Sequence, residues 1–475
     1  NGVACKSTFH FATRHPSRYP DGSASSETAT ESFYNCLSMR ALRTAMVLGT
    51  HGSQNVRQVT SRVASAKLAE RLVLLLFISF HLYGIGVIEM GDLSIAIWDV
   101  LIIIFFITYI IINKLFNCSV KISSLPLIFV VLSTIFTLWI LARALISPLP
   151  EGAFTMAAIQ VLNLCTVVIL AFSSRIDLSR LNHRILWAAA GLSVLAIALY
   201  VSAVLQYRRI IADPSLWRPS IGYIIDQGIV PRLTGLAKDP NFYSLWMSIP
   251  IAVGMYCGRR SMLLWVPVAL SVLMTLSRTF FIVLFFSLLF FVLIFITNKF
   301  RKYYIARSLM IISILIIILI SSFFWIDHDQ NIIHKRITIP ENATRFLHWA
   351  TVSGQLHEQW NPLIGNGLRS TQILLGGKYS HSTYLDVLFE TGLIGFSLWV
   401  LILGFIAVIS FQQIRRVNDA LIPWVYAFVF LFIYFFSFSL LYHPFVWMVM
   451  GVLVNQHNPP CGAHVVGLSN DRKVS

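Results

Sequence analysis

The sequence is poor in charged residues for its length. Only 12% of its 475 residues are Asp, Glu, Lys or Arg, whereas 57% are hydrophobic, and the mean hydropathy is +0.74. A water-soluble globular domain of this size needs more charge to cover its surface, so the composition excludes that class. The chain is predicted to be an all-α, polytopic membrane protein.

Cysteine is scarce, and so are signs of internal repetition. On the topology derived below, none of the cysteines lies in an outer loop, so no disulfide framework is expected. Without an evident repeat, a transporter built from two related halves is disfavoured. The cysteines are Cys5, Cys36, Cys118, Cys165, Cys257 and Cys461.

Acidic residues are fewer than basic ones, 20 against 36, which gives a net charge of +16. Much of this excess lies in short loops that alternate with apolar runs, as expected for cytoplasmic flanks above anionic lipid. The bilayer therefore accounts for much of the basic charge, and no nucleic-acid partner is expected.

Long apolar runs are what the sequence has in abundance. A membrane-spanning helix needs roughly 20 mostly apolar residues, and on that criterion about twelve runs are candidates. They lie near 71–90, 94–113, 125–145, 154–173, 185–206, 241–257, 261–276, 279–297, 307–326, 384–410, 421–438 and 443–455.

The distribution of Lys and Arg predicts the orientation. Alternate short loops are basic, whereas the loops at 91–93 and 146–153 carry no Lys or Arg. The basic loops are retained in the cytoplasm, so the two long connections, 207–240 and 327–383, are predicted on the outer face. Both termini are then cytoplasmic.

Three parts of the chain follow from these patterns. Residues 1–69 are polar, lack a sustained apolar stretch and do not begin with Met, so we expect a disordered or added cytoplasmic leader. Residues 70–455 form the transmembrane domain, and 456–475 form a polar cytoplasmic tail. The long outer loop is expected to carry short amphipathic helices, because Arg345 and Trp349 have helical spacing there.

Basic residues on the outer face break the charge rule and suggest an anion. Arg232 precedes the turn and cap signal Asp239-Pro-Asn, and Arg278 lies in a very short link between two apolar helices. Arg345 is the third candidate, in the long outer loop. An arginine at an interface often extends to lipid headgroups, so binding of an anionic substrate is one of two open interpretations for each.

The stretch from His381 to Gly395 lies where the long outer loop is predicted to re-enter the membrane. An imidazole there suits proton transfer, although a helix cap is the alternative. Glu390 is out of helical phase with His381 and is interpreted as a buried structural acceptor. Gly392 and Gly395 indicate close helix packing. Upstream, a turn is predicted from Asn361 through Gly365 to Gly367.

Taken together, these elements resemble the O-antigen ligase and polymerase superfamily over about residues 70 to 455. The specific part is the signature from His381 through Glu390 to Gly395, in which Ser382 stands where Asn is frequent. The resemblance implies a metal-independent, inverting glycosyltransferase without cofactor in the bacterial inner membrane. Its donor would be glycan linked to undecaprenyl pyrophosphate, used at the periplasmic face.

The resemblance also implies roles for individual residues. Arg232 and Arg278 match the family's pyrophosphate-binding arginines, with Arg345 beside them, and His381 matches its proposed general base. Arginines can stabilise the charge of a departing pyrophosphate without a metal ion. The acceptor would be a lipid A-core sugar or another glycan.

Alternatives remain open at this point. Asp327 and Asp329 could chelate a metal in an outer loop, but solvated helix ends explain them more simply. A lipid-linked glycan transporter would need charges along a path through the membrane, for which Asp99 and Arg143 are the candidates. Within the superfamily, a ligase and a polymerase share the donor chemistry and differ in the acceptor; the signature and the single dominant outer loop favour the ligase.

Overall fold

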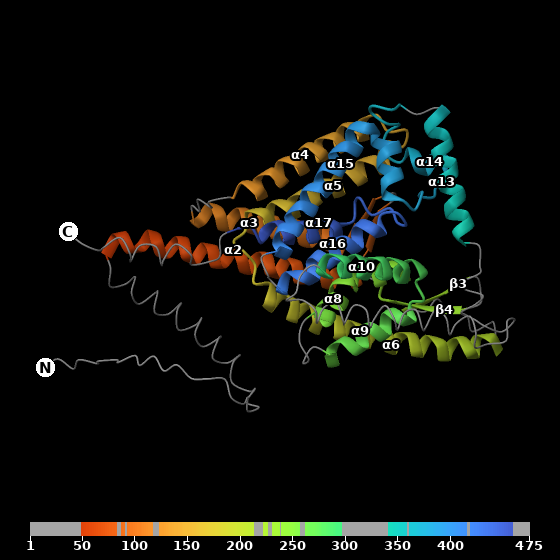
Figure 1. Cartoon of the computed structure of the whole chain (residues 1–475), viewed down its shortest axis with the longest axis horizontal. Helices are drawn as coiled ribbons and strands as arrows, with labels where there is room; N and C mark the ends of the chain where they lie inside the picture. The colour runs from red at the N-terminus through yellow and green to blue at the C-terminus, as the bar shows by residue number, and fades with distance from the viewer. Residues whose placement is uncertain are drawn as a thin grey trace. The chain divides into compact units, whose positions relative to one another are not determined.

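The computed structural model describes residues 49–82, 87–90, 93–116, 123–212, 222–226, 230–237, 239–256, 262–296, 341–358, 361–415 and 419–458. The chain divides into two units, 1–59 and 60–475. Of the first unit, the structure describes only the beginning of helix α2. All that follows concerns the second unit, whose elements are coloured in Figure 1.

Helices dominate the described residues. In chain order they are α2 (Gly49–His81), α3 (Ile97–Phe116), α4 (Ser124–Leu145), α5 (Pro150–Phe172), α6 (Leu178–Ala212), α7 (Pro240–Trp246), α8 (Ser248–Tyr256), α9 (Met262–Met274), α10 (Arg278–Ile296), α13 (Glu341–Glu358), α14 (Ser370–Leu374), α15 (Thr383–Arg415), the 3₁₀ turn Asp419–Leu421, α16 (Ile422–Tyr434) and α17 (Pro444–Asn455).

Four of the described helices are long and apolar enough to cross a membrane. They cover Ser124–Leu145, Pro150–Phe172, Leu178–Leu205 and Thr383–Ile414. Five shorter apolar helices accompany them: Ile97–Ile112, Leu263–Met274, Thr279–Phe290, Asp419–Tyr434 and Pro444–Asn455. The protein is thus a mostly helical membrane protein, as the composition predicts. The expected total of about twelve spans stays a prediction, and 307–326 lies outside the described residues.

Two predicted spans are interrupted. The span expected at 71–90 ends as a helix at His81, and Val87–Met90 is a strand instead. The span expected at 241–257 consists of α7 and α8, divided at Met247. The start of α7 confirms the predicted cap, because the side chain of Asp239 accepts a hydrogen bond from the backbone N–H of Asn241 at 2.6 Å.

Two antiparallel hairpins depart from the all-α expectation. Strand β1 (Val87–Met90) pairs with β2 (Leu93–Ala96), and β3 (Gly222–Asp226) pairs with β4 (Val230–Gly235). Strands this short carry too few residues for an alternating pattern to stand out between apolar helices. The second hairpin matters for the site, because β4 carries Arg232.

Aromatic side chains fill the centre of the helical packing. Helices α4, α5 and α15 lie side by side in Figure 1, and α17 packs on α5. Trp399 of α15 lies 5.8 Å, between ring centroids, from both Phe136 of α4 and Trp447 of α17. These large rings are buried and fix the spacing of the helices that support the site.

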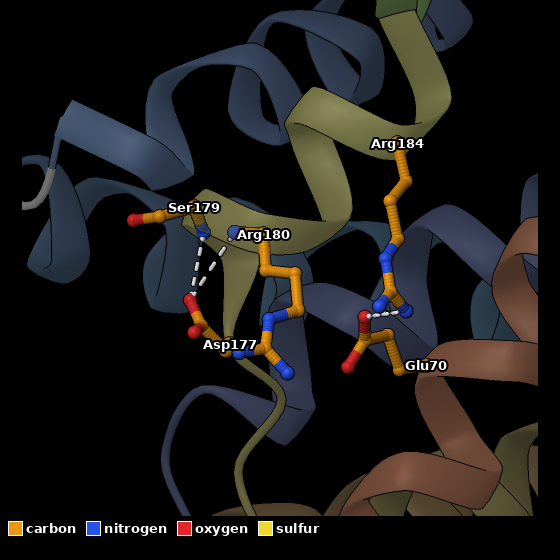
Figure 2. A network of polar contacts seen from close by, with 5 residues as sticks. All are labelled: Glu70, Asp177, Ser179, Arg180 and Arg184. Carbon is orange, nitrogen blue, oxygen red and sulfur yellow. Dashed lines mark hydrogen bonds and ion pairs between the residues drawn. The ribbon is translucent and has the colours of Figure 1, made fainter. Parts of the chain in front are cut away.

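A polar network joins α2 to the start of α6 (Figure 2). A nitrogen of Arg184 lies 2.7 Å from a carboxylate oxygen of Glu70. The Asp177 carboxylate accepts hydrogen bonds from the backbone N–H groups of Ser179 and Arg180 at 3.1 and 3.3 Å and so caps α6. The sequence predicts Arg180 and Arg184 in one of the basic cytoplasmic loops, whereas the structure places both in the first turns of α6.

Candidate functional site

His381 lies just before α15 in a left-handed backbone conformation, with φ of 60°. Residues other than glycine rarely adopt this conformation, so the surroundings must hold it. On one side, the carbonyl of Ser380 accepts a hydrogen bond from the indole N–H of Trp349 at 3.0 Å. On the other, the hydroxyl of Ser380 accepts from the backbone N–H of Ser382 at 3.0 Å.

The residues after His381 are tied to the segment that follows α16. The backbone N–H of Thr383 donates to the carbonyls of Phe435 and Phe438 at 2.8 and 3.1 Å. The Thr383 hydroxyl accepts from the backbone N–H of Leu440 at 2.9 Å. Asp386, one turn into α15, accepts a hydrogen bond from the hydroxyl of Ser439. The start of α15 and the segment around Phe438 therefore form one rigid support.

The imidazole of His381 is half-buried between two rings. The ring of His348 lies parallel to it, with 6.0 Å between centroids and 6° between planes. The ring of Phe438 meets it edge-on at 6.1 Å. Burial lowers the pKa of His381 to about 4, and the charges of Arg345, His348 and Lys378 contribute in the same direction. At neutral pH the imidazole is uncharged and able to accept a proton.

Arg345, on α13, reaches the same ring as His381. Its guanidinium carbon lies 5.7 Å from the centroid of Phe438, within the range of a cation–π contact. One of its terminal nitrogens donates to the hydroxyl of Thr279 at 3.0 Å. Arg345 therefore connects the neighbourhood of His381 to the first turn of α10.

Arg232, on β4, reaches the same link from the other side. Its side chain is buried, and its Nε donates to the carbonyl of Thr275 at 2.9 Å. Thr275 lies in the short link between α9 and α10, where Leu276 also has a left-handed backbone (φ 49°). Arg278 is the first residue of α10, so its backbone lies between the contact points of Arg232 and Arg345.

A chain of contacts encloses this cluster. The hydroxyl of Ser277 donates to the side-chain oxygen of Asn241 at 2.7 Å, and the phenol of Tyr434 donates to the Asn241 carbonyl at 3.1 Å. Tyr434 in turn stacks on Phe438 at 5.2 Å. The guanidinium groups of Arg232 and Arg345 both lie close enough to the Tyr434 phenol for their charges to act on it. Segments distant in sequence thus meet in one place.

The predicted turn at 361–367 packs against a break in α15. Gly392 has φ of 68° and ψ of −172°, which is not helical. Residues of the turn at 361–367 supply the backbone hydrogen bonds that α15 lacks at this break. The N–H of Gly367 donates to the carbonyl of Glu390 at 3.0 Å, and the N–H of Leu393 donates to the carbonyl of Pro362 at 2.8 Å. The expected partner of Gly392, a second helix, is therefore replaced by this turn.

Small residues are required where the turn meets the break. A Cβ on Gly365 would lie 2.4 Å from the backbone nitrogen of Gly392, and a Cβ on Gly392 would lie 2.4 Å from that of Gly365. The carbonyl of Gly365 also accepts from Arg143 at 2.9 Å, and the turn begins with the Asn361 carbonyl accepting from Gly365 at 2.8 Å. A Cβ on Gly395 would lie 2.8 Å from the indole nitrogen of Trp139 on α4.

The buried carboxylates of α15 serve this support. Glu390 is 4% exposed, and its carboxyl interacts with backbone groups of Arg369 and Thr371 at the start of α14. Asp386 is held by Ser439. Both side chains thus connect α15 to segments near His381.

Two residues of the cluster were not predicted from the sequence. His348 and Phe438 are far from His381 along the chain, so spacing gives no signal for them. His348 follows Arg345 by three residues, which places both on one face of a helix. That phase relationship was the only sequence signal available for His348.

The part of the chain that the structure describes contains no candidate metal site. There, no group of three or more His, Cys, Asp or Glu side chains is arranged to hold a metal ion. Asp327 and Asp329, the acidic pair considered from the sequence, lie outside the described residues.

Comparison with known families gives one match. Residues 263–400 match a family model, Wzy_C, described as O-antigen ligase. The matched segment includes Arg278, Arg345 and His381, whereas Arg232 precedes it. This match supports the resemblance found in the sequence. No curated protein matches the chain.

Proposed function

We propose, starting from the O-antigen ligase family to which residues 263–400 belong, that this protein is an inverting, metal-independent glycosyltransferase of the bacterial inner membrane. It moves glycan from undecaprenyl pyrophosphate to an acceptor sugar hydroxyl at the periplasmic face. Its termini lie in the cytoplasm, and the site is built within residues 70–455. The acceptor is a lipid A-core sugar or another glycan.

The observation that carries the proposal is the meeting of arginines and an uncharged imidazole at one place. Arg232 and Arg345 donate to residues on either side of Arg278, at Thr275 and Thr279. His381 shares the Phe438 ring with Arg345. A cluster of guanidinium groups suits a pyrophosphate, and an uncharged imidazole suits removal of a proton.

The reaction follows from these roles. Arg232, Arg278 and Arg345 hold the pyrophosphate and stabilise the negative charge that grows on it as the anomeric C–O bond breaks. His381 takes the proton from the acceptor hydroxyl, whose oxygen attacks the anomeric carbon from the opposite side. Attack opposite to the leaving group inverts the configuration. Asn361, Gly365, Gly367, Glu390, Gly392 and Gly395 support the site.

A transporter is disfavoured by the charges inside the helical region. Asp99 accepts a hydrogen bond from the backbone N–H of Ala96 at 2.9 Å, at the start of its own helix. Arg143 donates to the carbonyl of Gly365 at 2.9 Å. Both candidates for a charged path have local structural partners, which supports an enzyme over a path through the membrane.

The glycan profile of a strain lacking the gene tests the proposed function. For a ligase we expect lipid-linked polymer to accumulate while the acceptor stays bare. Single-repeat chains on the acceptor would instead indicate a polymerase, which uses the same donor chemistry. A wild-type profile, with a complemented strain as control, would contradict both forms of the proposal.

A further inference from the structure

His348 is a buried histidine without an assigned role, and it lies against the candidate base. It is 8% exposed, and its ring is parallel to that of His381 at 6.0 Å. Its Nδ1 is buried and has no hydrogen-bond partner among the described residues. A buried polar atom normally has a partner, so this histidine needs an explanation beyond packing.

Helix α13 brings His348 to the site together with other groups that define it. Arg345 and His348, three residues apart, contact Phe438 and His381 respectively. Trp349 holds the carbonyl of Ser380, next to His381, at 3.0 Å. The neighbouring side chain of Leu347 points away and is 64% exposed. The docking of one helix face therefore places a guanidinium, an imidazole and a backbone anchor around His381.

We propose that His348 is a positioning residue for His381 and fixes the plane of the His381 ring. This inference rests on the proposed function of His381 as the general base. The parallel ring of His348 and the nearly perpendicular ring of Phe438 lie on two sides of the His381 imidazole and restrict its orientation. An acceptor hydroxyl then meets a base of fixed direction.

Charged groups from more than one element act on the His381 imidazole. They are Arg345 and His348 on α13 and Lys378 in the segment before α15, whereas the segment after α16 contributes the uncharged ring of Phe438. Burial is the main cause that lowers the pKa of His381, and the charges of Arg345, His348 and Lys378 act in the same direction.

Two variants separate the positioning role from simple packing. His348→Phe keeps a stacking ring but cannot be charged, whereas His348→Ala removes the ring. Leu347→Ala is the matched control on the same helix. Transfer is measured with purified protein in lipid vesicles, using the lipid-linked donor and the acceptor extracted from a strain lacking the gene, across the pH range in which His381 titrates.

For His348→Phe we expect kcat at pH 8 close to wild type, with the acid limb of kcat/KM moved up by about one pH unit, because a cation that lowers the pKa of His381 is gone. For His348→Ala we expect the same shift and a kcat about tenfold to a hundredfold lower, with the donor KM unchanged. Leu347→Ala should match wild type. If His348→Ala does not fold, the acid limb of the kcat/KM profile of His348→Phe tests the inference by itself.

A wild-type kcat and a wild-type acid limb in both variants would overturn the inference, and so would equal losses in both without a shift of the limb. His381→Ala separates this inference from the proposed function. If His381→Ala is inactive and the His348 variants behave as wild type, only the role of His348 fails. If His381→Ala keeps full transfer, the proposed function fails with it.

Discussion

At the scale of single residues, the environment of His381 determines when it can act as a base. Burial and nearby cations lower its pKa to about 4, from an ordinary value of 6.5. A histidine with a lowered pKa loses its proton at a lower pH, so the basic form persists well below neutrality. On the proposed function, His381 is therefore already in its basic form in the free protein at neutral pH.

The pH dependence of transfer follows with a definite sign. Because kcat/KM reports groups of the free enzyme, we expect it to stay flat from pH 8 down to about 5 and to fall only as the pH approaches 4. The measurement is the pH profile of kcat/KM with brief exposure to acid and a check of recovery at pH 8. A reversible limb near pH 6.5 would show that the site leaves the pKa of His381 unchanged.

At the scale of elements, the break in α15 determines how the turn at 361–367 is held. The backbone angles of Gly392 fall in a region that is essentially restricted to glycine, and the turn at 361–367 fills the space where a side chain would be. Hydrogen bonds to residues 361–367 replace those that the broken turn of α15 loses. The same segment leads through α14 to His381.

A pair of alanine variants tests this element. Gly392→Ala should lower the stability by about 3 kcal/mol, because it adds backbone strain and a steric clash with Gly365. Gly404→Ala, in the same helix, has nothing within 4 Å of the new Cβ and should change stability by less than about 1 kcal/mol. Thermal unfolding in detergent measures both. Equal melting temperatures for the two variants would contradict the role given to the break.

At the scale of the whole molecule, the site depends on segments that are distant in sequence. Strand β4, the link between α9 and α10, helix α13, the start of α15 and the segment after α16 each supply a part. Helix α4 holds α15 and the turn at 361–367 through Trp139 and Arg143, which donate to the carbonyls of Thr391 and Gly365.

Hydropathy predicts most of the long helices, because a long apolar run in lipid must satisfy its backbone hydrogen bonds within itself and therefore forms a helix. The cap at Asp239 and the turn at Asn361 could be predicted because their residue types have specific backbone preferences. The hairpin carrying Arg232 and the break at Gly392 could not, since both depend on contacts with distant segments. The position of His348 beside His381 could not be predicted either, because their stacking contact forms only on folding.

The most direct test of the central claim is single-turnover transfer by purified His381→Ala and wild-type protein. The measurement follows release of undecaprenyl pyrophosphate and labelling of the acceptor, with donor binding as a control for folding. For wild type we expect release of undecaprenyl pyrophosphate and labelling of the acceptor at the same rate. For His381→Ala we expect normal donor binding and transfer about 10² to 10⁴ times slower, the range expected for loss of a general base. Transfer by His381→Ala at the wild-type rate would contradict it.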